Sequence, residues 1–260
     1  MTVPASENSK GRSMALLAAF LGWMFDGMEM GLFPIAGRPA LLELLGGAEG
    51  VGRWMAWITA SFLIGAAAGG VLFGWLGDRI GRVKALMFSV LCYSVFSGLC
   101  TFVGAPWHLL VLRFLASLGM GGEWALGVAL VMEIWPAQSR PLLSGIIGAA
   151  ANVGFLIVGF VALGVTKFVG GLGRALFFLP DSWVDGLLRN NGWRMLFLVG
   201  ALPALLTFVI RLFVPESEKW KQASLNAPNK PRVQDIFRPG LARLTVRGSL
   251  LAGVALLGTW

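Results

Sequence analysis

Five ionisable side chains lie inside long apolar stretches of this sequence. The first stretch carries Asp26 and Glu29, and the fourth carries Arg113, Glu123 and Glu133. On insertion scales, a charge at the centre of a membrane helix costs roughly 2.5–3.5 kcal/mol. Residues kept at such a cost are typical of proton relays and substrate pathways. We therefore expect the chemistry of this protein to reside in this small set.

Depth along the helices separates these five residues. A rise of 1.5 Å per residue places Glu29 about 22 Å from the inner face and Arg113 at about 21 Å. This depth predicts an ion pair between them. Asp26 lies about 4–5 Å lower on nearly the same helical face, so it remains an alternative partner. Glu123, about 24 Å from the outer face, is expected either in a cytoplasmic charge network or in a substrate cavity. Trp124 either stacks on a substrate ring in that cavity or faces lipid.

The apolar stretches are long enough to cross a bilayer. Hydrophobic residues make up 57% of the 260 residues and charged residues only 13%, and the mean hydropathy is +0.76. About 20 apolar residues span the hydrocarbon core. We expect an all-α membrane protein whose six spans form one bundle, at about residues 14–35, 54–77, 85–104, 108–133, 142–164 and 193–213.

The segments between and after these spans differ in character. Residues 36–53 are expected to form an outer loop. The six-helix domain covers residues 1–213, and a polar, basic, proline-bearing cytoplasmic linker covers residues 214–245. Residues 246–260 read as the start of a seventh transmembrane helix, so the chain is expected to be truncated or half of a larger transporter.

The placement of the basic residues explains the net charge of +8. Most of the 21 Lys and Arg residues fall in segments that a cytoplasmic N-terminus puts on the inner side. This asymmetry is the positive-inside rule. It predicts a cytoplasmic N-terminus, and it removes the reason to expect a nucleic-acid partner. We expect an integral, multi-pass protein of a bacterial inner membrane.

The connection between the second and third spans carries a dense motif. It reads Gly74-Trp75-Leu76-Gly77-Asp78-Arg79-Ile80-Gly81-Arg82-Val83-Lys84. This segment resembles the G-x-L-x-D-R-x-G-R-x-K motif that joins the second and third helices of major facilitator transporters. The resemblance implies one six-helix half of the major facilitator fold, with substrate held between two such halves.

Further motifs resemble particular branches of that superfamily. The segment from Arg113 to Gly122 is similar to the R-x5-G-x-G-G motif of proton-coupled facilitators. Asp26-Gly27-Met28-Glu29 is similar to the D-G-x-D of metabolite and aromatic-acid:proton symporters, with Glu in place of the second Asp. In those families the first-helix acid is the implied proton carrier, and the fourth-helix Arg is its partner. A purely structural ion pair is the alternative.

Two motifs resemble the inner-side sequences of sugar and organic-acid porters. One contains Glu133, Pro136 and Arg140, and the other is the Val214–Trp220 segment, which has Glu218 in place of a proline. Together with the second–third connection, they imply a cytoplasmic charge network that holds the inner helix ends together and favours an outward-open state. Its expected members are Gly74, Asp78, Arg79, Gly81, Arg82, Glu133, Arg140 and Glu216.

The resulting hypothesis is a secondary active transporter that symports protons with a small organic acid or related metabolite. Its expected partners are the substrate, protons, the lipid bilayer and a missing C-terminal half or second chain. The alternatives are a sugar porter, a half-transporter that needs a partner chain, and a truncated remnant that does not transport. We expect no enzyme, no cofactor and no metal site, because the sequence offers a single histidine and no nucleophile–base set.

Overall fold

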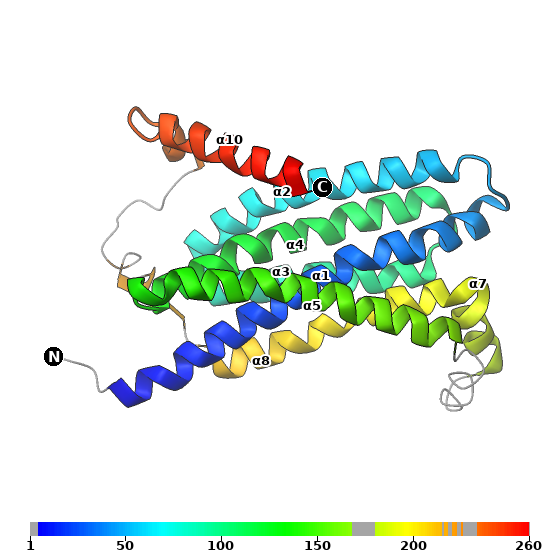
Figure 1. Cartoon of the computed structure of the whole chain (residues 1–260), viewed down its shortest axis with the longest axis horizontal. Coiled ribbons are helices and arrows are strands. Elements are labelled where there is room, and N and C mark those ends of the chain that lie inside the picture. Colours follow the sequence, from blue (N-terminus) through cyan, green and yellow to red (C-terminus); the bar gives the residue numbers. More distant parts are fainter. Residues whose placement is uncertain are drawn as a thin grey trace.

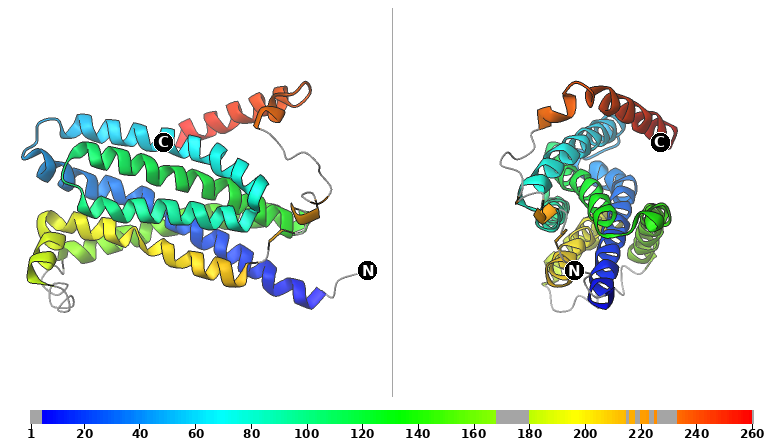
Figure 2. Two further views of the ribbon diagram at one scale, coloured as in Figure 1. Left: turned by 180° about the vertical axis from the view of Figure 1, so that it is seen from behind. Right: turned by 90° about the vertical axis from the view of Figure 1, so that its left-hand side faces the viewer.

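The structure is a computed structural model that describes residues 5–167, 180–214, 216–217, 220–222, 225 and 233–259, and it describes the side chains of most of these residues from residue 13 onward. These residues form helices and short connections, with no strand among them. The long helices run side by side as an elongated bundle (Figures 1 and 2). The turn between α2 and α3 lies at the same end of this bundle as the N-terminus.

Five helices are long and apolar enough to cross a membrane, counted over the described residues. They are α1 Ala5–Leu45, α2 Val51–Ile80, α3 Arg82–Leu99, α4 Pro106–Ile134 and α5 Arg140–Lys167. Two 3₁₀ turns, η1 Cys100–Phe102 and η2 Ala137–Ser139, lie next to them. The rest of the chain forms α7 Asp181–Val199, η3 Leu202–Leu205, α8 Leu206–Phe213, η4 Val233–Phe237 and α10 Ala242–Thr259.

The sixth predicted span, residues 193–213, is divided rather than continuous. The backbone is non-helical from Arg189 to Gly192, and the chain then runs through the end of α7, η3 and α8. Pro203 sits at the start of η3. Because proline lacks an N–H and its ring clashes with the preceding turn, the helix tightens into a 3₁₀ turn there.

The first helix is longer than the sequence indicated. The predicted outer loop over residues 36–53 is wrong, because α1 continues to Leu45 with Pro34 and Pro39 inside it. The connection to α2 is therefore only a few residues long. Gly46, with positive φ, follows the last residue of α1, which is a common way for a helix to end. Gly50, also with positive φ, precedes the first residue of α2.

The turn between α2 and α3 is reduced to Gly81. Its φ of 107° and ψ of 152° lie in a region that side chains other than glycine rarely adopt. The basic connection predicted from the motif is thus a helix end, one glycine and a helix start.

Helices that are distant in sequence pack most closely. The α2 helix packs chiefly on α4, and α5 packs chiefly on α1. Within each pair the glycines are reciprocal. Gly69 lies against the carbonyl oxygen of Leu118, and Gly121 of α4 lies against that of Ala66. The α1–α5 pair repeats the pattern with Gly27 against Ala151 and Gly154 against Met24. Small residues of this kind let membrane helices approach closely.

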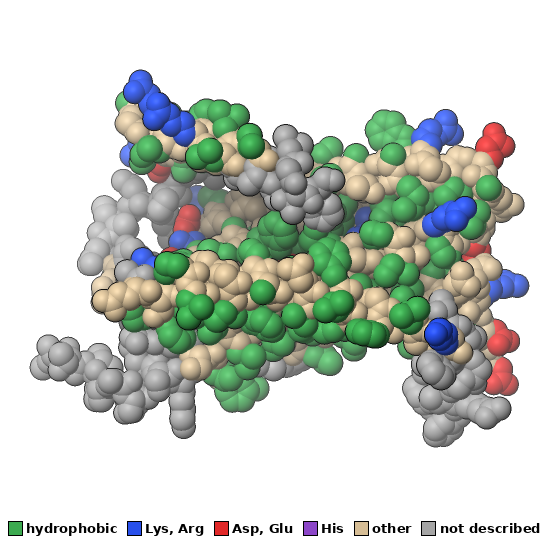
Figure 3. Space-filling view, viewed as in Figure 1, with side chains coloured by type: hydrophobic (Ala, Val, Ile, Leu, Met, Phe, Trp, Pro, Cys, Tyr) green, Lys and Arg blue, Asp and Glu red, His purple; other side chains and the backbone are tan. Residues whose placement is uncertain are grey.

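The exterior is apolar along the middle of the bundle. On the face drawn in Figure 3, hydrophobic side chains cover the centre, and charged side chains gather near the two ends. Large apolar side chains such as Phe102, Phe160 and Leu212 are well exposed. This distribution suits a bundle surrounded by lipid with its ends in water.

Replacing Gly69 tests the α2–α4 contact. A Cβ at this position would overlap the Leu118 carbonyl, so Gly69→Ala is expected to lower stability by about 1–3 kcal/mol through overpacking. Gly74→Ala is the matched control on the same helix, because a Cβ there meets nothing within 4 Å. Thermal unfolding in detergent measures both. Equal midpoints for the two variants would contradict this packing.

Candidate functional site

Glu29 and Arg113 form an ion pair in the interior of the bundle. The Arg113 Nη1 donates a hydrogen bond to Glu29 Oε1. Each of these residues is only 1% exposed. The helices α1 and α4 thus bring together the two residues that the depth count paired. A buried pair of this kind is expensive to break, because removing one partner leaves the other charge uncompensated.

A third helix completes the environment of Glu29. The Ser97 hydroxyl of α3 donates to Glu29 Oε1 at 2.7 Å. Gly200, at the end of α7, packs closely enough that a Cβ there would lie 2.9 Å from Glu29 Oε2. The sequence analysis missed both residues. For Ser97 the available signal was its helical spacing from two other hydroxyl residues, Ser94 and Thr101, which are also buried.

Two phenylalanine rings flank the Arg113 guanidinium. Its Cζ lies 5.3 Å from the ring centroid of Phe33 and 4.7 Å from that of Phe62. Both distances are within the range in which a ring face attracts a cation. The Arg113 Nε has no hydrogen-bond partner among the described residues. The guanidinium is therefore held by one carboxylate and two rings, and its buried Nε–H is left without an acceptor among the described residues.

Two further acids are buried close to this pair. Asp26 is 0% and Glu123 is 1% exposed, and their carboxylates are near enough to interact electrostatically. Neither Asp26 oxygen makes a hydrogen bond of ordinary geometry with the described residues, although the Trp124 indole lies nearby. Glu123 lies against Gly22 of α1, whereas the sequence placed it in the cavity or the charge network. The described core thus holds three carboxylates and one guanidinium.

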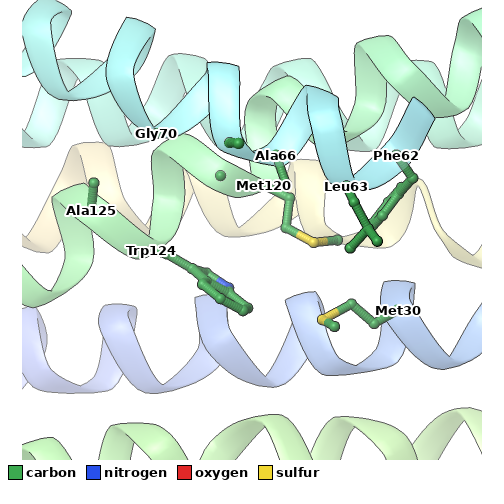
Figure 4. Close-up of a pocket in the computed structure, with 10 residues that line it drawn as sticks. Met30, Phe62, Leu63, Ala66, Gly70, Met120, Trp124 and Ala125 are labelled. Carbon is green, nitrogen blue, oxygen red and sulfur yellow. The ribbon is translucent and has the colours of Figure 1, made fainter. Parts of the chain in front are cut away.

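An apolar cavity opens between α1, α2 and α4. Its volume is about 520 Å³, and its lining includes Met30, Phe62, Met120 and Trp124 (Figure 4). The Trp124 ring also stacks on Trp23, with centroids 5.4 Å apart. Of the two sequence-predicted cavity residues, Trp124 is therefore in the wall, and Glu123 is not among the lining residues.

An inner charge cluster, which we define as Asp78, Arg82, Glu133 and Glu216, lies at the end of the bundle that holds the α2–α3 turn. Arg82 Nη1 pairs with Asp78 Oδ1 at 2.7 Å. Arg82 Nε pairs with Glu133 Oε1 at 3.2 Å. One guanidinium thereby joins the ends of α2, α3 and α4.

Glu216 enters this cluster as a helix cap. Its carboxylate accepts the backbone N–H of Arg82 at 2.8 Å and that of Val83 at 3.2 Å. A negative charge at a helix N-terminus is favourable. Gly81 makes room for it, because a Cβ there would collide with the Glu216 carboxylate. The Trp220 indole adds a hydrogen bond to the Asp78 carbonyl at 3.0 Å.

The other predicted network members make different contacts. The Arg79 guanidinium lies 4.3 Å from the Trp75 ring centroid. Arg140 Nε donates to the Trp135 carbonyl at 3.4 Å, and it forms no ion pair with Glu133 among the described side chains. A Cβ added at Gly74 would meet no atom within 4 Å. Glu218, where the sequence departs from the porter motif, lies outside the described residues.

A second polar cluster at the opposite end was not predicted. Glu43 accepts hydrogen bonds from Asn190 at 2.6 Å and from the Trp193 indole at 2.8 Å. It also pairs with Arg194 at 2.5 Å. These contacts fix the end of α1 to the start of the divided sixth span. Glu43 fell in the predicted outer loop, and a residue in a loop is not assigned to a helix face. Its contacts with a neighbouring helix could therefore not be predicted.

Comparison with known proteins agrees with this arrangement. The sequence profile of the Major Facilitator Superfamily matches residues 15–260. This chain belongs to the major facilitator superfamily. It is accordingly an integral, multi-pass membrane protein with one half-bundle of that fold.

Individual relatives and a solved structure are similar over most of this chain. A Haemophilus influenzae protein named for metabolite transport is 38% identical over 216 residues, which are 82% of this chain and 46% of that protein. The cis,cis-muconate transport protein of Acinetobacter baylyi is 30% identical over 218 residues, 84% of this chain and 46% of its own length. The proton:xylose symporter XylE matches with a TM-score of 0.69 and 22% identity, covering 84% of this chain and 47% of XylE. The chain spans about half the length of these relatives.

The buried ion pair of this major facilitator half predicts unequal effects of two isosteric changes. Glu29→Gln is expected to cost about 3–5 kcal/mol, because it leaves Arg113 buried without its carboxylate. Asp26→Asn is expected to cost much less, since no ion pair of Asp26 occurs among the described residues. Thermal unfolding in detergent compares the two. A larger loss for Asp26→Asn would overturn the assignment of the partner of Arg113.

Removing the remote helix cap gives a local prediction. Glu216→Ala is expected to speed amide hydrogen exchange at Arg82 and Val83 about tenfold, because charge-assisted hydrogen bonds contribute about 1.5–3 kcal/mol. Glu49→Ala, in an exposed turn, serves as the control. Hydrogen–deuterium exchange mass spectrometry measures the rates. Unchanged exchange in Glu216→Ala would mean that α3 does not depend on this cap.

Proposed function

We propose that this chain is one half of a secondary active transporter that carries a small organic acid together with protons. The second half would come from further sequence of the same protein or from a partner chain. The observation that carries this proposal is the Glu29–Arg113 pair, which is buried deep in the bundle beside an apolar cavity. An ion pair at membrane depth is costly, and such residues typically serve transport or proton movement.

Glu29 is proposed as the proton carrier. A proton on its carboxyl removes the negative charge that faces Arg113, and so weakens the ion pair. Arg113 then presents, close to the cavity, a positive charge that no carboxylate neutralises. That charge favours an anionic substrate over a neutral one. Asp26, one turn earlier on α1, is the alternative carrier in the same proposal.

The substrate class is inferred from the same geometry. The cavity walls are apolar and include the Trp124 ring, which suits a flat or unsaturated carbon skeleton. A carboxylate group would complement Arg113. The name of the similar muconate transport protein, whose substrate is a dicarboxylate, supports this class.

The inner charge cluster is proposed to stabilise one state of the cycle. Arg82 ties together the ends of α2, α3 and α4, and Glu216 adds the segment after α8. These contacts favour a compact inner end, as in an outward-open transporter, and their release would accompany opening to the cytoplasm. The distribution of basic residues supports a cytoplasmic N-terminus.

Uphill uptake by the complete gene product in proteoliposomes tests the proposal. Uptake of cis,cis-muconate or benzoate is expected to rise severalfold when an inward proton gradient is imposed. Glu29→Gln is expected to abolish this gradient-driven accumulation, because an amide cannot carry the proton. Xylose serves as the neutral comparison.

Two results would contradict the proposal. One is that Glu29→Gln and Asp26→Asn both retain accumulation against a gradient. The other is that xylose is accumulated and neither acid is, which would favour a sugar porter.

A further inference from the structure

The structure contains a side chain that belongs to both the ion pair and the cavity. Phe62 of α2 lines the cavity with Met30 and Trp124 (Figure 4). The same ring lies 4.7 Å from the Arg113 guanidinium. Arg113 itself is 1% exposed and is not among the residues that line the cavity. Phe62 therefore separates a buried cation from the space where a substrate would sit.

The ring also compensates the charge of Arg113. An aromatic face attracts a guanidinium, and the attraction is greatest where water is excluded. Phe33 and Phe62 would still contact Arg113 after Glu29 is neutralised. Protonation of Glu29 alone thus leaves the cation flanked by rings and out of contact with the cavity.

The backbone of α2 around Phe62 is packed against α4, so the Phe62 side chain is the part of this contact that can move. Gly65 packs against Ser117 and Phe114 of α4. The Ser61 hydroxyl donates to the Ile58 carbonyl of its own helix at 3.1 Å and lies 3.4 Å from the Leu110 carbonyl of α4. These contacts join α2 to α4 on both sides of Phe62. A carboxylate in the cavity can reach Arg113 by displacing the Phe62 ring, without separation of the helices.

Arg113 also retains a donor for such a ligand. Its Nε has no hydrogen-bond partner among the described residues, and neither does the second oxygen of Glu29. A carboxylate could accept this N–H and compete with Glu29 for the guanidinium. A neutral ligand offers at most another ring face or a neutral acceptor, and a hydrogen bond to such an acceptor is weaker than one between two ionised groups.

We propose that Phe62 is a shutter that admits the carboxylate of a substrate to Arg113 and excludes neutral ligands from it. Phe62 is thus a specificity-determining residue, and its rotation connects occupation of the cavity to the Glu29–Arg113 pair. The role of Phe62 in transport rests on the proposed function. The control of access to Arg113 by the Phe62 ring does not depend on it.

Chemical modification of Arg113 tests that access without any transport assay. The complete gene product, purified in detergent, is treated with 2,3-butanedione, and the rate of modification of each arginine is followed by mass spectrometry. Phe62→Ala is expected to speed modification of Arg113 at least tenfold. Benzoate is expected to slow that faster reaction severalfold, whereas benzamide, its neutral analogue, is expected to leave it unchanged.

Phe73→Ala is the matched control. Phe73 lies on the same helix, is 8% exposed like Phe62, and packs on Gly122 of α4 rather than on Arg113. The exposed Arg53 provides an internal reference rate. Phe62→Leu, which keeps much of the volume but lacks the ring face, replaces Phe62→Ala if the latter does not fold.

The outcomes are decided by the rate at Arg113. Faster modification in the Phe62 variant than in Phe73→Ala, with protection by benzoate alone, supports the shutter. Equal rates in the two variants, or equal protection by benzamide, would overturn it. A protein that fails to accumulate acids but shows the shutter result would refute the proposed function and leave this inference standing.

Discussion

The interior of this bundle is organised around one buried guanidinium. Arg113 contacts a carboxylate from α1 and an aromatic ring from each of α1 and α2, while α3 reaches the same carboxylate through Ser97. In a low-dielectric interior a charge without partners is very costly. The positions of three helices relative to α4 are therefore constrained by the need to keep Arg113 and Glu29 compensated.

Close backbone packing makes that arrangement possible. The reciprocal glycines of the α2–α4 and α1–α5 pairs bring each helix against a carbonyl of its neighbour. Without a hydrophobic driving force between helices in lipid, such packing is the main source of association. The polar centre and the glycine contacts thus depend on each other, since the short interaxial distances place Phe62 and Glu29 within reach of Arg113.

The features that could be predicted from the sequence are those that depend on the length and composition of a single continuous segment. Five spans, the position of the α2–α3 turn and the depth match of Glu29 with Arg113 follow from apolar length and helical rise. The extension of α1 to Leu45 was missed because apolar length sets only the minimum length of a span, and the helix continues beyond residue 35 through Pro39. Contacts between remote segments, such as Glu216 capping α3 or Glu43 binding Asn190, leave no periodicity to detect.

The residues around the buried ion pair were likewise only partly predictable. Residue type and depth identified Asp26 and Glu123 as acids inside the bundle. They could not predict that Glu123 lies against Gly22 rather than in the cavity. Phe62 is an ordinary residue of an apolar helix, and its role becomes visible once the helices are placed around Arg113.

The pairing of α1 with α5 and of α2 with α4 has a consequence for biogenesis. The first helix leaves the ribosome and enters the bilayer well before either α4 or α5 has been synthesised. Until then its two carboxylates have no guanidinium to face, and each would add several kilocalories per mole to the cost of insertion if ionised. The two acids are therefore expected to enter the bilayer in their neutral form, and Glu29 is expected to ionise only once α4 brings Arg113 beside it.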